Sequence, residues 1–138
     1  MIVGITFSAF DLCHAGHVLM LKECKAKCDY MIVGLQTDPT IDRPNKNKPI
    51  QTTFERSTQL NGLRWVDEVI PYDTELDLLN MLSILPINKR FIGSEYLGEY
   101  IHGEDICNNR NIDIVYIDRM HSYSSSELRK RIYASENK

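Results

Sequence analysis

The chain has 138 residues, of which 43% are hydrophobic and 25% are charged, with a formal net charge of −3. These values are typical of one soluble globular domain over residues 1–138, and they exclude the broad basic surface that binds nucleic acid. No apolar run approaches the roughly 20 residues of a membrane span. The apolar start at residues 1–7 is shorter than a signal peptide, so we expect a cytoplasmic protein.

The hydrophobic pattern predicts strands that alternate with helices. In chain order we expect a strand at 1–7, a helix at 16–28, a strand at 30–35, a helix at 54–64, a strand at 66–72, a helix at 75–85, a strand at 90–93, a helix at 104–110, a strand at 112–117 and a helix at 125–133. Thr53 is the expected N-cap of the second helix, and Pro86 ends the third. The order predicts a Rossmann-like three-layer α/β/α fold with a five-stranded parallel sheet.

Residues 36–53 form a long polar loop after the second strand, with prolines at 39, 44 and 49. Loops of this length are uncommon unless they are functional or disordered. In parallel α/β sheets, ligands bind beyond the carboxyl ends of the strands. The candidate ligand-binding segments are therefore residues 8–17, 36–53, 93–103 and 118–126.

The first of these segments carries two histidines in the sequence FDLCHAGH, residues 10–17. His14 and His17 are three residues apart at the start of a helix, so both face one side of it. The amides and dipole of a helix start attract anions, and Gly16 leaves room for a phosphate to approach the backbone. The pair can stabilise charge on a phosphorus atom during transfer. The alternative is two surface histidines near a helix cap.

The last segment carries Arg119 and the serine run Ser124, Ser125 and Ser126, just past the fifth strand. Serine hydroxyls and helix-start amides can hold the β and γ phosphates of a nucleotide, with Arg119 neutralising their charge. The alternative is a plain serine N-cap. Because both segments follow neighbouring strand ends, together they predict a nucleotide site.

Three stretches resemble the cytidylyltransferase family. FDLCHAGH resembles its GTFDxxHxGH signature, RWVDEVI at 64–70 its RYVDEVI stretch, and residues 119–128 its RTxGISTTxI segment. The likeness covers nearly the whole chain and is closest to the small bacterial type that includes glycerol-3-phosphate cytidylyltransferase. The resemblance implies transfer of CMP from CTP to a phosphorylated small alcohol, such as glycerol 3-phosphate. The acceptor would attack the α-phosphorus directly and release pyrophosphate.

The resemblance also implies roles for individual residues. The catalytic set is His14, His17, Lys46 and Arg119. The nucleotide-binding set is Ser8, Ala9, Phe10, His14, Gly16, His17, Gly93, Glu95, Arg119, Tyr123, Ser124, Ser125 and Ser126. The residues expected to contact the acceptor are Asp11, Asp38, Lys46 and Lys48. A register shift leaves open which of the two lysines is functional. The alternative is that both lysines belong to a solvated loop. Mg²⁺ is implied as a cofactor held by the nucleotide phosphates, with no protein side chain as a ligand.

The RWVDEVI stretch implies a homodimer. In relatives this stretch lies at or near the dimer interface, so Arg64, Trp65 and Asp67 are the candidate interface residues, with Trp65 as an anchor. The alternative is a helix end followed by a strand with a surface ion pair.

Three departures from the family pattern bear on the substrates. Ser8-Ala9 replaces Gly-Thr, and Gly93-Ser94-Glu95-Tyr96 replaces Gly-Asp-Asp-Trp. The acidic stretch 73–78 replaces the tryptophan and lysines of the glycerol phosphate enzymes, which argues against glycerol 3-phosphate. The chain is also similar to sugar 1-phosphate adenylyltransferases of the heptose type, while Arg119 favours CTP over ATP. The alternatives are an ATP-dependent adenylyltransferase acting on a sugar phosphate and a catalytically degenerate nucleotide-binding module.

Overall fold

Strands and helices alternate along the chain in a computed structural model that describes residues 1–119 and 121–137. The elements are β1 (Val3–Ser8), α1 (Ala15–Ala26), β2 (Tyr30–Gln36), α2 (Thr53–Asn61), β3 (Glu68–Tyr72), α3 (Glu75–Ile84), β4 (Lys89–Gly93), the 3₁₀ turn η1 (Ser94–Tyr96), α4 (Glu104–Asn109), β5 (Asp113–Ile117) and α5 (Ser125–Glu136). Each predicted strand and helix is present, with ends that shift by a few residues.

The strands form one parallel sheet in the order β3-β2-β1-β4-β5. The chain therefore builds outward from β1 to β3 and then returns to the other side of β1, which makes a switch point between β1 and β4. Ser8 pairs with Leu35 at one side of this point, and Gly93 pairs with Ile117 at the other. The predicted Rossmann-like fold with a five-stranded parallel sheet is confirmed.

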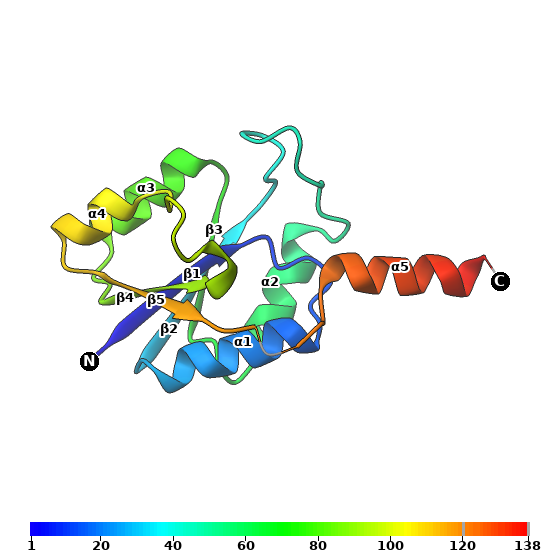
Figure 1. The fold of residues 1–138 in the computed structure, drawn as a ribbon, viewed down its shortest axis with the longest axis horizontal. Helices are drawn as coiled ribbons and strands as arrows, with labels where there is room; N and C mark the ends of the chain where they lie inside the picture. Colours follow the sequence, from blue (N-terminus) through cyan, green and yellow to red (C-terminus); the bar gives the residue numbers. More distant parts are fainter. Residues whose placement is uncertain (120, 138) are drawn as a thin grey trace.

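Helices cover both faces of the sheet (Figure 1). On one face Leu21 of α1 and Leu60 of α2 pack with Val33 of β2, and on the other Leu82 of α3 packs with Ile32. Neighbouring residues of β2 thus point to opposite faces, and both faces are apolar. This explains why the strand is a continuous apolar run rather than an alternating one.

The last helix, α5, projects away from the body of the molecule (Figure 1). Ser124 is its N-cap, where the Oγ atom accepts a hydrogen bond from the amide of Glu127 at 3.0 Å. None of its described residues is buried. Among the described residues, no helix has the length and hydropathy needed to cross a bilayer.

The start of α2 differs from the prediction. Its N-cap is Thr52 and not Thr53, because only Thr52 has a glutamate three residues later that completes a capping box. The Thr52 Oγ1 atom accepts from the amide of Glu55 at 3.1 Å, and the Glu55 carboxylate accepts from the amide of Thr52 at 3.0 Å. The helix also ends earlier, at Asn61, because residues 62–67 form turns that lead into β3.

Candidate active site

The loop that follows β1 contacts the loop that follows β5. The two predicted histidines lie at the start of α1, directly after the β1 loop. His14 is the N-cap, and its Nδ1 atom accepts from the amide of Gly16 at 3.0 Å. The Nδ1 atom of His17 accepts from the amide of His14 at 3.2 Å. The two rings stack with their centroids 3.9 Å apart. Because both Nδ1 atoms accept, each neutral ring carries its proton on Nε2 and presents an Nε2–H donor.

The surroundings keep both histidines neutral at physiological pH. Burial, together with the neighbouring His14, lowers the pKa of His17 to about 4, although Asp11 acts in the opposite direction. Burial lowers the pKa of His14 as well, and the nearby His121 and Arg119 add to this effect. The pair therefore consists of preorganised hydrogen-bond donors at a helix N-terminus, which is suited to stabilising an anion.

The loop between β1 and α1 has an unusual backbone. Phe10 and Leu12 both have positive φ angles, of 49° and 52°, in the left-handed region that residues other than glycine rarely adopt. Phe10 is 1% exposed, and its ring lies 5.3 Å from the ring of His17. Such conformations persist only where surrounding contacts enforce them, and they concentrate at functional sites. The sequence carries no signal for this feature, because neither residue type favours it.

Asp11 supplies several of those contacts. Its carboxylate accepts from the amides of Ile50 at 2.9 Å and Gln51 at 3.0 Å, and it forms an ion pair with Arg129 of α5 at 2.7 Å. Burial raises the pKa of Asp11, but these hydrogen bonds outweigh burial and hold the pKa below its usual range. The Asp11 carbonyl also accepts from the Ser125 hydroxyl at 2.9 Å. The residue predicted to contact the acceptor thus uses both carboxylate oxygens to join the β1–α1 loop, the long loop and α5.

Arg56 of α2, like Asp11, joins several segments of the site through its hydrogen bonds. The sequence did not predict this role. Arg56 is 1% exposed, and its guanidinium donates to the carbonyls of Ala9 at 2.8 Å, Gln36 at 2.6 Å, Thr37 at 2.7 Å and Gln51 at 3.1 Å. These carbonyls lie at the ends of β1 and β2 and at both ends of the long loop. An arginine in the first turns of a helix that follows this loop was the only available signal, and its burial cannot be read from the sequence.

Arg119 lies exposed after β5, where its Nη2 atom donates to the carbonyl of Tyr123. The serines that follow have different environments. Ser124 caps α5, Ser125 bonds to the loop after β1, and Ser126 is exposed. The hydroxyls of Ser124 and Ser125 therefore have structural partners within the chain, while their backbone amides stand at a helix start.

The remaining predicted nucleotide-binding residues lie at the ends of β1 and β4. Ser8 is exposed and Ala9 is partly buried. Gly93 ends β4 directly beneath the carboxylate of Glu95 in η1, and a Cβ atom on Gly93 would overlap that carboxylate. A side chain at position 93 would therefore push the exposed Glu95 carboxylate away from the end of the strand.

The predicted acceptor residues of the long loop are exposed or locally engaged. Lys46 and Lys48 are exposed, and among residues 1–119 and 121–137 neither forms a hydrogen bond or ion pair through its Nζ atom. Asp38 accepts from the amide of Thr40 at 2.9 Å and from its hydroxyl at 2.6 Å, and these hydrogen bonds lower the pKa of Asp38. Both lysine side chains are therefore exposed on the surface of the long loop.

The predicted interface residues lie between α2 and β3. Trp65 is partly buried against the core, with Lys22 Nζ at 5.8 Å and the Arg64 guanidinium at 5.6 Å from its ring centroid. Asp67 is committed within its own chain, because its Oδ2 atom accepts from Lys25 Nζ at 2.5 Å and from the amide of Met31 at 2.7 Å. Arg64 and the exposed edge of Trp65 remain accessible.

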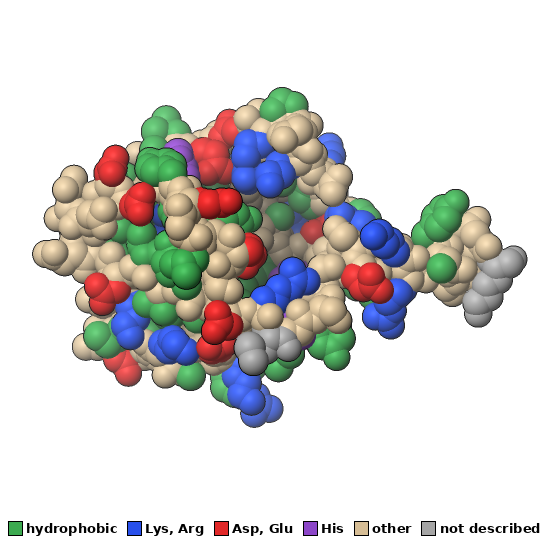
Figure 2. Space-filling view, in the orientation of Figure 1, with side chains coloured by type: hydrophobic (Ala, Val, Ile, Leu, Met, Phe, Trp, Pro, Cys, Tyr) green, Lys and Arg blue, Asp and Glu red, His purple; other side chains and the backbone are tan. Residues whose placement is uncertain are grey.

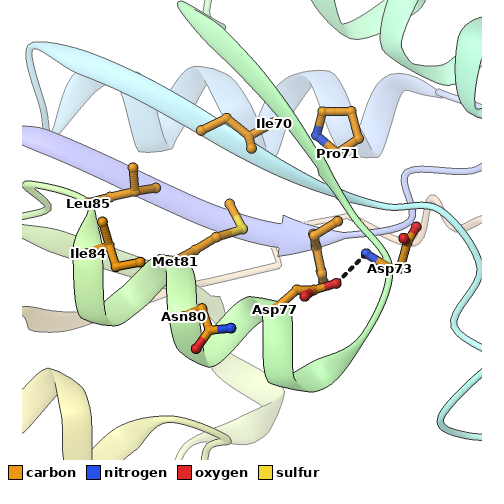
Figure 3. A pocket seen from close by; sticks show the side chains of 9 residues that line it. Ile70, Pro71, Asp73, Asp77, Asn80, Met81, Ile84 and Leu85 are labelled. Carbon is orange, nitrogen blue, oxygen red and sulfur yellow. Dashed lines mark hydrogen bonds between the residues drawn. The ribbon is translucent and has the colours of Figure 1, made fainter.

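Figure 2 shows a hollow near the centre of one face, over the carboxyl end of β1 in the orientation of Figure 1 and bordered by both basic and acidic side chains. A separate pocket of about 460 Å³ lies between β3 and α3, where Ile70 and Pro71 face Met81 and Ile84 (Figure 3). None of its nine lining residues is cationic, so it lacks the charge that phosphate binding needs. Within the described ranges, no group of three or more His, Cys, Asp and Glu residues could hold a metal ion.

The five-stranded parallel sheet with helices on both faces is that of the nucleotidyltransferase fold. Residues 5–131 match the family model described as cytidylyltransferase-like. The chain belongs to this family.

Among curated relatives, the chain is 34% identical over 131 residues to the bifunctional protein HldE of Granulibacter bethesdensis, covering 94% of this chain and 27% of that protein. It is 31% identical over 130 residues to the HldE protein of Nitrobacter hamburgensis, covering 94% of this chain and 26% of that protein. The chain thus spans about a quarter of the length of these relatives.

Solved structures agree with the fold. A lipopolysaccharide core biosynthesis protein from Thermoplasma volcanium is 28% identical with a TM-score of 0.68, covering 90% of this chain and 99% of that one. Pantothenate synthetase from Thermus thermophilus has a TM-score of 0.64 at 12% identity, covering 95% of this chain and 64% of that one, which is a likeness of fold alone.

Proposed function

We propose that the protein transfers a nucleoside monophosphate from a nucleoside triphosphate to a phosphorylated small molecule, with release of pyrophosphate. One observation carries the proposal: His14 and His17 present two fixed Nε2–H donors at the start of α1. Membership of the cytidylyltransferase-like family supports the same reaction.

The chemistry follows from these donors. A phosphate oxygen of the acceptor attacks the α-phosphorus, the bond from that phosphorus to the bridging oxygen breaks, and pyrophosphate leaves with the electron pair. Negative charge grows on the phosphate oxygens in the transition state, where the histidine donors and Arg119 stabilise it. Mg²⁺ would be held by the nucleotide phosphates, with no protein side chain as a ligand, and would neutralise part of their charge. No proton transfer and no covalent enzyme intermediate is needed.

For the donor we propose CTP. Arg119 lies on the loop after β5, and its positive charge contributes, after burial, to the lowered pKa of His14 and of His17. An arginine in this segment is typical of the cytidylyl branch that the sequence resembles. For the acceptor we propose a phosphorylated small alcohol or sugar, bound in part by Lys46 or Lys48 of the long loop.

A second candidate is transfer of AMP from ATP to a sugar phosphate. The similarity to the HldE proteins and to a lipopolysaccharide core biosynthesis protein favours it, because the sequence also resembles sugar 1-phosphate adenylyltransferases of the heptose type. The acidic start of α3, with Glu75 and Asp77, fits a polyhydroxy acceptor better than a small acceptor held mainly by its phosphate.

Pyrophosphate release separates these possibilities. The purified protein is incubated with Mg²⁺, with CTP or ATP, and with a panel of phosphorylated alcohols and sugars. Release with CTP and one acceptor supports the cytidylyl proposal, and release with ATP alone moves the protein to the adenylyl branch. Nucleotide binding without release across the whole panel would refute catalysis and favour a degenerate nucleotide-binding module.

We also propose a homodimer that buries Arg64 and the exposed edge of Trp65. Arg64→Glu should then shift sedimentation velocity from dimer to monomer at the same protein concentration. A wild-type protein that sediments as a monomer at high concentration would contradict the dimer.

A further inference from the structure

The nucleotide site contains a third histidine, His121, in the loop between β5 and α5. It lies two residues after Arg119, at a position that the family segment RTxGISTTxI leaves variable. The feature therefore belongs to this chain and not to the family pattern. It raises the question of what an imidazole does beside the other two.

His121 and His14 approach the same point from two different elements. A Cβ atom built on Gly16 would lie 2.7 Å from the Cε1 atom of His121 and 2.8 Å from the Cε1 atom of His14. The two rings thus flank the glycine at the start of α1, and any side chain at position 16 would displace them. The close approach joins the loop after β5 to the helix start where the anion is expected.

The orientation of His121 repeats that of the other two histidines. Its Nδ1 atom accepts a hydrogen bond from the amide of Tyr123 at 3.1 Å, and its ring stacks on the Tyr123 ring at a centroid distance of 5.3 Å. A neutral ring with an accepting Nδ1 atom carries its proton on Nε2. All three imidazoles are therefore fixed by backbone amides in the same tautomer, each with one Nε2–H donor for a ligand.

We propose that His121 is a third phosphate-binding residue, which donates from Nε2 to a β- or γ-phosphate oxygen and so binds the leaving pyrophosphate. This inference rests on the proposed nucleotidyl transfer. His14 and His17 lie on the helix that faces the reacting phosphorus, whereas His121 lies across Gly16, on the loop that carries Arg119. That loop is the one whose sequence pattern predicts contact with the β and γ phosphates.

The test compares binding of ligands that differ in their phosphates. Isothermal titration of His121→Ala with MgCTP, MgATP, magnesium pyrophosphate, CMP and AMP measures the affinity that the donor supplies. Losing one hydrogen bond to a charged ligand should weaken triphosphate and pyrophosphate binding roughly 10- to 100-fold. Monophosphate binding should stay within about twofold, because a monophosphate lacks the contacted groups.

Two further variants exclude a merely structural effect. His121→Gln keeps an N–H group near the position of Nε2 and should recover part of the lost affinity. Tyr133→Ala removes a ring that is 71% exposed on α5, outside the predicted ligand-binding segments, and should bind every ligand as wild type does. Equal weakening of monophosphate and triphosphate binding in His121→Ala would indicate loop disruption and overturn the proposal.

The outcome for His121 is separable from the outcome for the reaction. Unchanged triphosphate and pyrophosphate affinity in His121→Ala, beside a wild type that releases pyrophosphate, overturns the third donor and leaves the proposed function intact. A wild type that binds no triphosphate overturns both.

Discussion

Arg56→Met tests whether one buried guanidinium holds the strand ends and the long loop together. Methionine has a similar length and fills the space, but it donates no hydrogen bond. The change leaves four backbone carbonyls without their partner, those of Ala9, Gln36, Thr37 and Gln51. These carbonyls lie at the ends of β1 and β2 and in the long loop. The substitution should therefore destabilise the packing of all three segments, and not a single contact.

The expected cost follows from the burial of those carbonyls. A buried acceptor without a partner costs about 1–3 kcal/mol, and charged donors make the stronger bonds. The bond to Gln36 is fully buried, whereas the bonds to the other three carbonyls are part-buried, so water can replace some of them. We therefore expect a loss of about 3–5 kcal/mol, a large part of the roughly 5–15 kcal/mol that stabilises a typical domain. The melting temperature should fall by about 10–15 °C.

Thermal unfolding followed by circular dichroism measures this fall. Arg131→Met is the matched control, since Arg131 is exposed on α5 and its loss should change the melting temperature by little. Arg56→Lys should lie between the two, because an ammonium keeps the charge but cannot reach all four carbonyls. A melting temperature of Arg56→Met within about 3 °C of wild type would refute the reasoning.

Three further predictions concern the site itself. Gly16→Ala should lower turnover at least about tenfold with little change in melting temperature, since its Cβ displaces imidazole rings and not backbone; near-wild-type turnover would contradict the crowding. The unfolded chain protonates His17 near pH 6.5 and the folded chain only near 4, so the free energy of unfolding should fall by on the order of 3 kcal/mol as the pH drops through this window. Urea titrations at pH 7 and 4.5 measure the free energy of unfolding at each pH. In His17→Gln this part of the difference between the two free energies should be absent, and a difference equal to that of wild type would contradict the shifted pKa. Of Lys46→Ala and Lys48→Ala, one should raise KM or lower kcat about tenfold while the other stays near wild type, and two equally silent variants would exclude the loop lysines.

The fold and the histidine pair could be predicted from the sequence because their signals are local. Each strand is a short apolar run, and the spacing of His14 and His17 at a helix start places both rings on one side whatever the rest of the chain does. The first turn of α2 was harder, because Thr52 and Thr53 are both able to cap, and only the distance to Glu55 decides between them.

The junctions of the site could not be predicted, because their partners are distant in sequence and are mostly backbone atoms. Asp11 reads as a candidate ligand for substrate, yet the amides that its carboxylate binds lie 39 and 40 residues away. In the sequence, Arg56 is one arginine of a predicted helix. Its partners include the backbone carbonyls of Ala9 and Gln36, and no sequence pattern predicts which backbone carbonyls an arginine will contact. His121 has the same difficulty, since its closeness to Gly16 exists only once β5 lies in the same sheet as β1.

Transfer of the α-phosphate is tested most directly with CTP and ATP labelled at that phosphorus, incubated with Mg²⁺ and each phosphorylated acceptor in turn. Wild-type protein should move the label into a product that contains the acceptor, and His17→Ala should form at least about 100-fold less of it while melting as wild type does. Label that never leaves the nucleotide in the wild type, or a His17→Ala variant with full turnover, would contradict nucleotidyl transfer at this histidine pair.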